Sequence, residues 1–309
     1  MKISIILPAY NEESTIKDTI EDFHLNLPQA YIWVINNRST DSTYKIAMET
    51  IEKNGYRGGV INESRPGKAN AVRRAFIEID SDIYILADAD LTYPANEVLS
   101  LMDPIIKNEA DMVVGDRISS GHYKNQNKRP LHNAGNSLVC FLVNFLFNSS
   151  LSDIMSGYRV FNRRFVKNYP IIVEGFEIET DMTLHALDKR FRVVELPVSY
   201  KDRPQGSISK LNTFKDGFRV LFIIFNILRY YRPLIFFGSI SIFSFLIAFI
   251  SGIPVLYDWL NYKYIYHIPL AILATGLSII GVVLFSIALI LDSIVNLDKR
   301  IYERDVLAG

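Results

Sequence analysis

The chain has 309 residues, enough for one large domain and a smaller segment. Lysine and arginine together number 33, as do aspartate and glutamate, so the net charge is zero and no overall basic field points to a nucleic-acid partner. Cys140 is the only cysteine, which excludes a disulfide framework within the chain and a cysteine-based metal site.

The first 120 residues alternate between strand and helix patterns. Short β-branched apolar runs predict strands, and apolar residues at helical spacing predict the helices between them, with Asp41 or Ser42 as an N-cap. The predicted strands cover 3–7, 31–35, 59–61, 83–87 and 112–114, and the predicted helices cover 13–26, 42–52, 69–79 and 96–107. This order predicts an α/β fold, Rossmann-like, with a mostly parallel sheet and helices on both faces.

Polar residues follow three of these strands. They are Pro8 to Glu12, Asn36 to Asp41, and Asp88 to Asp90. Ligands of such sheets bind beyond the carboxyl ends of the strands, so we expect the site there.

The last third of the chain contains two stretches without a charged residue, Leu234 to Leu256 and Ile268 to Leu291. Roughly 20 apolar residues span a bilayer, so we expect two transmembrane helices, with two long core helices as the alternative. Basic residues flank the pair at Arg232 and Lys299, whereas the connecting loop has only Lys263. The positive-inside rule therefore predicts that both termini and the N-terminal domain are cytoplasmic, in a multi-pass protein of the cell (inner) membrane.

Two further apolar segments precede the spans. Residues 213–232 have phenylalanines and leucines at helical spacing, which predicts an amphipathic helix at the membrane surface, or a helix buried against the N-terminal domain. Leu138 to Phe147 is expected to pack in the core, with the membrane or a second subunit as the alternative. The predicted organisation is a catalytic domain at 1–212, the juxtamembrane helix at 213–232, two transmembrane helices within 233–292 and a cytoplasmic tail at 293–309.

Three common nucleotide-binding or metal-binding motifs do not occur in the sequence. No G-x-G-x-x-G follows the first strand, and no P-loop or H-E-x-x-H occurs. Asp88-Ala89-Asp90 at a strand end presents two carboxylates suited to Mg²⁺ or Mn²⁺ bound to a diphosphate. Taken alone, this pattern is more often a solvated turn.

Several motifs accompany this pair in a fixed order. The first set is Pro8-Ala9-Tyr10-Asn11-Glu12, Asn37-x-Ser39-Thr40-Asp41-x-Thr43, Gly67-Lys68-Ala69 and Asp88-Ala89-Asp90-Leu91. Together they resemble the family-2 glycosyltransferases, which have a GT-A nucleotide-sugar domain. The second set is Gly115-Asp116-Arg117, Lys128-Arg129-Pro130, Ser156-Gly157-Tyr158-Arg159, Gly175-Phe176-Glu177-Ile178-Glu179-Thr180 and Ser209-Lys210-Leu211-Asn212. These resemble the polyprenyl-phosphate branch, similar to dolichyl-phosphate mannose or glucose synthases.

The resemblance implies a role for each matching residue. Pro8, Tyr10, Glu12, Asn37 and Lys68 would bind the nucleotide-sugar, and Asp88 and Asp90 would hold the metal and the diphosphate. Arg117 and Arg129 would meet the acceptor phosphate, because a guanidinium binds phosphate oxygens in pairs. Arg203, Ser209 and Lys210 would close over the donor. Glu177 and Glu179 open a helix, so capping is an alternative role for them.

One position departs from the family pattern. The chain has Asn36-Asn37-Arg38-Ser39 where the family usually has Asp-Asp-Gly-Ser. An asparagine presents one donor and one acceptor, which suits uracil, whereas an aspartate suits guanine. Asn37 therefore favours a UDP-sugar over a GDP-sugar, with simple closure of the turn as the alternative.

The resemblance implies an inverting transfer of a sugar from a nucleotide-sugar to a polyprenyl phosphate such as undecaprenyl phosphate, with Mg²⁺ or Mn²⁺ as cofactor. A homo-oligomer would also be compatible with the anchored members. One rival is a processive polysaccharide synthase, which would carry a Gln-x-x-Arg-Trp motif that neither Trp33 nor Trp259 supplies. The other rival is a non-catalytic membrane partner that binds nucleotide-sugar, against which the intact Asp88 and Asp90 argue.

Overall fold

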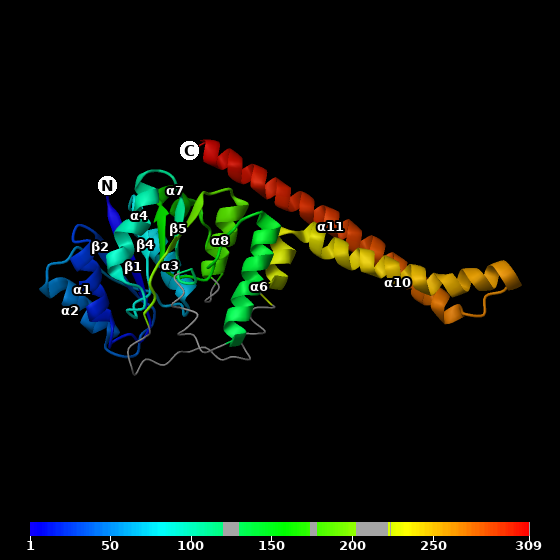
Figure 1. The fold of residues 1–309 in the computed structure, drawn as a ribbon, viewed down its shortest axis with the longest axis horizontal. Helices are drawn as coiled ribbons and strands as arrows, with labels where there is room; N and C mark the ends of the chain where they lie inside the picture. Colours follow the sequence, from blue (N-terminus) through cyan, green and yellow to red (C-terminus); the bar gives the residue numbers. More distant parts are fainter. Residues whose placement is uncertain (120–129, 174–177, 202–221, 223, 309) are drawn as a thin grey trace. The chain divides into compact units, whose positions relative to one another are not determined.

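The computed structural model describes residues 1–119, 130–173, 178–201, 222 and 224–308. The chain divides into two compact units, Met1–Val220 and Leu221–Gly309. The first unit is built on a seven-stranded sheet with the order β3-β2-β1-β4-β6-β5-β7 (Figure 1).

The sheet is mixed but mostly parallel, as predicted. Strands β1 (Ile3–Ala9), β2 (Tyr31–Asn36), β3 (Gly58–Asn62) and β4 (Ile83–Leu86) pair in parallel. Strand β6 (Arg159–Asn162) is antiparallel to β4 and to β5 (Met112–Asp116), and β7 (Val193–Pro197) is parallel to β5. The predicted strands are all present, and β6 and β7 lie beyond the part of the chain for which strands were predicted.

Helices cover both faces of this sheet (Figure 1). They are α1 (Ile16–Asn26), α2 (Thr43–Lys53), α3 (Lys68–Glu78), the 3-10 turn η1 (Ala95–Glu97), α4 (Val98–Ile106), α6 (Pro130–Phe147), α7 (Arg163–Asn168) and α8 (Ile178–Asp188). Ile5 and Leu7 of β1 face a core shared with α1, α2 and α4. On the opposite face, Phe76 of α3 contacts the rings of Tyr84 and Phe161.

Two helix starts lie two or three residues after the predicted position, and the N-cap of α2 is at Ser42, one of the two predicted residues. The first helix begins at Ile16 rather than residue 13, because the preceding residues form hydrogen bonds with the loop after β2. Residues 95–97 form a 3-10 turn before α4. Ser42 occupies the N-cap of α2 without a side-chain cap bond, whereas Asp41 Oδ1 accepts a hydrogen bond from the Thr43 backbone N–H at 3.0 Å.

Helix α6 has one face buried in the core and one face exposed. Val139, Cys140, Val143 and Leu146 are buried, as core packing requires, while the outer face exposes large apolar side chains. Those exposed side chains are Leu138, Phe141 and Phe145. The prediction of core packing for residues 138–147 therefore holds for one face.

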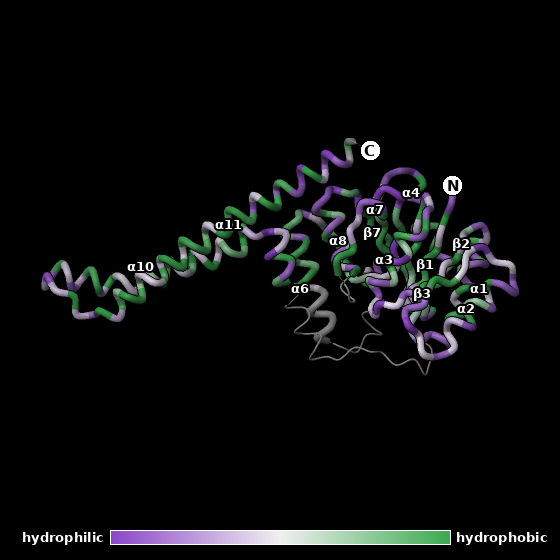
Figure 2. The backbone as a smooth tube through the Cα atoms, turned by 180° about the vertical axis from the view of Figure 1, so that it is seen from behind, coloured by the Kyte–Doolittle hydropathy of each residue, from purple (hydrophilic) through white to green (hydrophobic). Residues whose placement is uncertain are grey.

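The second unit consists mainly of two long helices, α10 (Pro233–Tyr262) and α11 (Ile268–Ala308). Both are long and apolar enough to cross a membrane, and few of their apolar residues are buried, which argues against the core-helix alternative. Figure 2 shows the hydrophobic colour along α10 and the first part of α11. Residues 222 and 224–231 are also helical, Arg232 is the N-cap of α10, and residues 213–221 and 223 of the predicted amphipathic helix lie outside the described residues.

Small polar residues join the two long helices. The hydroxyl of Ser241 donates to the Gly281 carbonyl oxygen at 2.7 Å, and the hydroxyl of Ser244 donates to the Leu277 carbonyl oxygen at 2.8 Å. Small residues let helices approach closely in lipid, where no hydrophobic effect drives them together. The pairing of α10 with α11 is therefore compatible with a bilayer.

Candidate active site

The loops that carry the sequence motifs meet at one edge of the sheet. Parallel pairing aligns Ala9 with Asn36, and Asn36 with Asn62, so β1, β2 and β3 end together. Strand β6 runs the other way and begins at Arg159 opposite Leu86, the last residue of β4. The loops after β1 to β4, the loop before β6 and the loop after β5 therefore share this edge.

The first two loops are fastened to each other. The backbone N–H of Asn11 donates to the Ser39 hydroxyl at 3.1 Å, and its side-chain oxygen accepts from the backbone N–H of Thr40 at 2.8 Å. The backbone N–H of Glu12 donates to the Thr43 hydroxyl at 2.8 Å. Pro8 and Glu12 are half-buried beside these contacts, and Tyr10 is exposed. The predicted nucleoside residues therefore belong to one rigid double loop.

Asn37 joins this double loop to the turn before α3. Its side-chain nitrogen donates to the Arg65 carbonyl oxygen at 2.6 Å, and its side-chain oxygen accepts from the Gly67 backbone N–H at 2.8 Å. A carboxylate could accept from Gly67 but could not donate to Arg65. Local closure of this turn therefore accounts for an asparagine at position 37 without reference to a nucleobase.

We expect Asn37→Asp to weaken the binding of UDP-sugar and GDP-sugar by similar factors, roughly tenfold, because one hydrogen bond is lost and two oxygens repel each other. Donor KM values measured for both nucleotides check this. Asn37→Ala should weaken binding of both in the same way. A switch of preference from uracil to guanine in the aspartate variant would instead show that Asn37 reads the base.

Lys68 lies between two carboxylates from distant parts of the chain. Its Nζ is 2.5 Å from Asp88 Oδ1 and 2.6 Å from Glu179 Oε1. Burial alone would lower the pKa of Lys68, but the charges of Asp88 and Glu179 outweigh it and raise the pKa above its ordinary value. Lys68 is therefore a permanent cation at the edge of the sheet, and Glu179, which had no assigned role beyond capping, belongs to the same site.

Gly157 packs directly against this group. A Cβ built on Gly157 would lie 3.0 Å from Lys68 Nζ and 3.1 Å from Asp88 Oδ2. The backbone N–H of Gly157 donates to the Tyr93 hydroxyl at 2.9 Å, which holds the loop in place. The Ser156-Gly157 motif thus has a steric reason, because a side chain would displace the charged groups.

Gly157→Ala should lower kcat by roughly tenfold, since a shift of a few tenths of an ångström in Asp88 or Lys68 misaligns the reacting groups. Steady-state kinetics of the purified protein measure this. Gly252→Ala is the matched control, because a Cβ there would meet nothing within 4 Å. Equal activity of Gly157→Ala and the wild type would show that the close approach does not matter for catalysis.

Asp90 is held by the residue that follows its turn. Its Oδ1 accepts from the Thr92 hydroxyl at 2.6 Å and from the Thr92 backbone N–H at 3.2 Å, and its side chain is buried. The carbonyl oxygen of Ala89 accepts from the Thr15 hydroxyl at 2.8 Å, which ties the same turn to α1. The turn is therefore an ordered element of the site rather than a solvated loop.

The acidic turn fits a divalent cation by its donor chemistry. Asp88 and Asp90 are all-oxygen donors on one turn, as hard cations prefer. No group of three or more His, Cys, Asp or Glu suited to a metal occurs in the part of the chain that the structure describes. Two carboxylates are sufficient where diphosphate oxygens and water complete the coordination.

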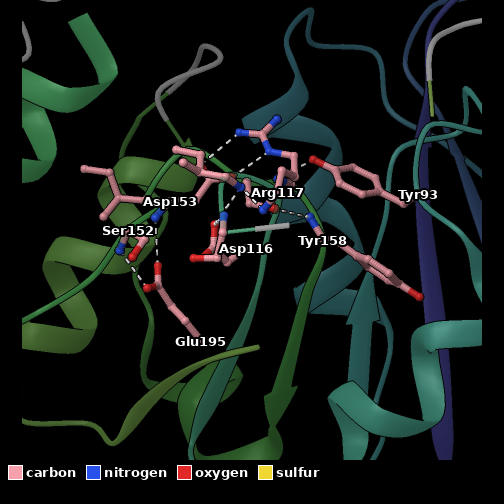
Figure 3. A network of polar contacts seen from close by, with 12 residues as sticks. Tyr93, Asp116, Arg117, Ser152, Asp153, Tyr158 and Glu195 are labelled. Carbon is pink, nitrogen blue, oxygen red and sulfur yellow. Dashed lines mark hydrogen bonds and ion pairs between the residues drawn. The ribbon is translucent and has the colours of Figure 1, made fainter. Parts of the chain in front are cut away.

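Arg117 is fixed by a buried carboxylate (Figure 3). Its Nε and Nη2 donate to the two oxygens of Asp153, at 2.7 and 2.9 Å. Asp153 and Ser152 in turn donate their backbone N–H groups to the Glu195 carboxylate. Burial raises the pKa of Glu195, against the opposing effect of these two hydrogen bonds. The edge of Arg117 that would pair with a phosphate is therefore occupied by Asp153.

Comparison with known proteins identifies the family. Residues 4–169 match the family described as Glycosyl transferase family 2. The chain is a family-2 glycosyltransferase. It is 28% identical over 303 residues to Glycosyltransferase AglJ of Haloferax volcanii, covering 98% of this chain and 96% of that protein. It is 30% identical over 264 residues to the Dolichol-phosphate mannosyltransferase of Pyrococcus furiosus, covering 82% of this chain and 70% of the relative.

The fold of this glycosyltransferase also has solved counterparts. Glucosyl-3-phosphoglycerate synthase from Mycobacterium tuberculosis superposes with a TM-score of 0.53 at 22% identity, covering 72% of this chain and 79% of that structure. The predictions of a glycosyltransferase and of a GT-A fold are confirmed.

Arg159 is the largest fully buried side chain among the residues that the structure describes, and its role could not be inferred from the sequence. Its guanidinium donates to the carbonyl oxygens of Ser156 and Ile154, at 2.8 and 2.7 Å, and to the Thr183 hydroxyl at 2.9 Å. Burial lowers the pKa of Arg159, while the charges of Glu179 and Asp153 oppose that shift. Arg159 therefore holds the loop that places Gly157 against Asp88.

Several predicted site residues of the glycosyltransferase lie outside the described residues. They are Arg129, Glu177, Arg203, Ser209 and Lys210. Among the described residues, Asp88 and Glu179 both form an ion pair with Lys68. The described residues also place the Asn37 loop and the Arg117 network at the same edge of the sheet.

Proposed function

We propose that this glycosyltransferase moves a sugar from a nucleoside-diphosphate sugar to the phosphate of a polyprenyl phosphate, with inversion, at a membrane surface. One observation carries the proposal: a family-2 catalytic unit and two membrane-length apolar helices occur in the same chain. The similarity to the Pyrococcus Dolichol-phosphate mannosyltransferase, which extends over 264 residues, supports it. So does the 26% identity over 216 residues to Polyprenol monophosphomannose synthase of Mycolicibacterium smegmatis.

The acceptor's chemistry explains why the site needs no strong base. The second pKa of a phosphate monoester is about 6, so the phosphate is mostly dianionic at neutral pH and is already a nucleophile. The requirement is then to aim the phosphate at the sugar and to stabilise the departing nucleoside diphosphate. The described residues of the site include fixed cations and carboxylates and fit this requirement.

We propose a role for each residue that matches a family motif. Pro8, Tyr10, Glu12 and Asn37 form the edge that would bind the nucleoside, and Asp88 and Asp90 would hold a divalent cation. That cation, Mg²⁺ or Mn²⁺, would neutralise the charge that develops on the diphosphate. Lys68 adds a positive charge at the same turn. Nucleoside diphosphate leaves as one phosphate oxygen of the acceptor bonds to the sugar carbon from the opposite face.

The acceptor phosphate also needs positive charge. We propose that Arg117, whose guanidinium is fixed by Asp153, supplies part of this charge. Arg129 would supply a second guanidinium, and Arg203, Ser209 and Lys210 would close over the donor. Undecaprenyl phosphate is the acceptor to test first, and the proposed location is the inner membrane with both termini in the cytoplasm.

The direct test is to incubate the purified protein with a panel of UDP- and GDP-sugars and undecaprenyl phosphate, and to identify the lipid product by mass. We expect a polyprenyl-phosphate-linked sugar of inverted anomeric configuration. Free undecaprenol is the matched control acceptor. Transfer to undecaprenol at the same rate as to its phosphate would contradict the proposed acceptor chemistry.

The two long helices lead to a separate expectation about the membrane. The full-length protein should sediment with membranes and enter solution only with detergent, because α10 and α11 expose apolar side chains along their length. Ultracentrifugation of lysed cells, with and without detergent, measures this. Recovery of the full-length chain in the detergent-free supernatant would show that the helices do not anchor it.

A further inference from the structure

The group formed by Asp88, Lys68 and Glu179 has an arrangement that the proposed chemistry does not by itself require. Lys68 comes from the first turn of α3, Asp88 from the loop after β4, and Glu179 from the first turn of α8. The ammonium group lies at nearly the same distance from both carboxylates, 2.5 and 2.6 Å. Lys68 and Glu179 are largely buried, and Asp88 is the most exposed of the three.

The charge of Lys68 poses a problem for metal binding at this turn. A lysine paired with Asp88 alone would cancel the charge of one of the two carboxylates that a divalent cation needs. Glu179 contributes a second negative charge to the same ammonium group. Asp88, Glu179 and Lys68 together then carry one net negative charge, and Asp90 adds another, so the turn keeps a negative charge for the cation.

Glu179 makes a contact that extends well beyond the start of its own helix. Its carboxylate forms an ion pair with a residue 111 positions away in the sequence. The start of α8 still favours a negative side chain, because the helix dipole is positive there. The carboxylate of Glu179 lies against Lys68 at 2.6 Å.

We propose that Glu179 is a positioning residue that shares the Lys68 ammonium with Asp88 and so sets the affinity of the Asp88 and Asp90 turn for a divalent cation. This inference rests on the metal site of the proposed function. Gly157 makes the arrangement tight, since a Cβ there would meet both Lys68 and Asp88.

The experiment measures Mn²⁺ binding directly, from the loss of the free-ion electron paramagnetic resonance signal, on the full-length protein in detergent. It is repeated with UDP and with GDP. Glu179→Gln should weaken Mn²⁺ binding about tenfold, because Lys68 then pairs with Asp88 alone. Lys68→Met should strengthen it. In the Lys68→Met background, Glu179→Gln should change binding by less than about threefold, since the two residues act through each other.

Two further variants separate charge from structure. Glu179→Asp keeps the negative charge and should stay within about threefold of the wild type. Glu49→Gln, at an exposed ion pair on α2, is the matched control and should change nothing. Melting curves show which variants are folded. If Glu179→Gln alone does not fold, Mn²⁺ binding by Lys68→Met is compared with that of the Lys68→Met, Glu179→Gln double variant. Neither of these two variants contains a lysine at position 68 that lacks a partner, so the comparison still tests whether Glu179 acts through Lys68.

Four results would overturn the inference. One is an equal effect of Glu179→Gln with and without Lys68, and another is weaker Mn²⁺ binding in Lys68→Met. A wild type that binds Mn²⁺ while Glu179→Gln binds it equally well refutes the role of Glu179 and leaves the proposed function intact. A wild type that binds no Mn²⁺, with or without UDP or GDP, refutes the metal site and this inference together.

Discussion

Replacing Asp90 by asparagine should lower kcat for sugar transfer by about 10³-fold or more, the range seen when a group that stabilises developing charge is removed. The amide oxygen can still accept the two hydrogen bonds from Thr92, so the turn should keep its shape. The lost negative charge leaves the cation with Asp88 as its remaining ligand on this turn. Product formation and the melting temperature should be measured on the same preparation.

Asp103→Asn is the control for this variant, because Asp103 lies in an exposed ion pair with Lys107 on α4. It should keep full activity. Excess EDTA should abolish the wild-type reaction, and added Mg²⁺ or Mn²⁺ should restore it. Full turnover of Asp90→Asn, or of the wild type in EDTA, would show that the acidic turn does not act through a metal.

Arg159→Met should lower both stability and activity. Without the guanidinium, the carbonyl oxygens of Ser156 and Ile154 and the Thr183 hydroxyl lose buried hydrogen-bond donors. The relief of burying a charge offsets part of that loss, which leaves a net cost of about 3 kcal/mol. For a domain of this size, that cost corresponds to a melting temperature lower by roughly 6–12 °C. Scanning fluorimetry in detergent measures the shift.

Arg163→Met is the neighbouring control, because Arg163 pairs with Asp80 at the surface and should contribute little. Arg159→Lys should recover only part of the stability, because an ammonium group cannot reproduce the planar donor geometry. Activity of Arg159→Met should fall even at temperatures where the variant is folded, because the loop that presents Gly157 to Asp88 loses its support. A stable, fully active variant would contradict this role.

The local sequence was sufficient to predict the strands and helices of the first half of the chain. Buried parallel strands need mostly apolar runs rich in β-branched residues, and Ile3 to Leu7 and Ile83 to Leu86 have them. The acidic turn at Asp88 and Asp90 and the two uncharged spans were equally visible, because each depends on residues adjacent in the sequence. Helix ends were predicted less well, since contacts between neighbouring loops moved the start of α1 to Ile16.

The partners within the site were decided by the tertiary structure. Lys68 and Glu179 are 111 residues apart, and Arg117 and Asp153 are 36 apart, so no local spacing relates them. The reversed strand β6 brings the Ser156 to Arg159 motif beside Asp88, and that reversal depends on long-range pairing with β4 and β5. Residue type indicated which side chains could carry a charge. The strand order of the sheet determined which of these charged side chains lie next to each other. A buried charge is stable inside a protein only beside such a partner, so the sequence by itself could not predict these pairs.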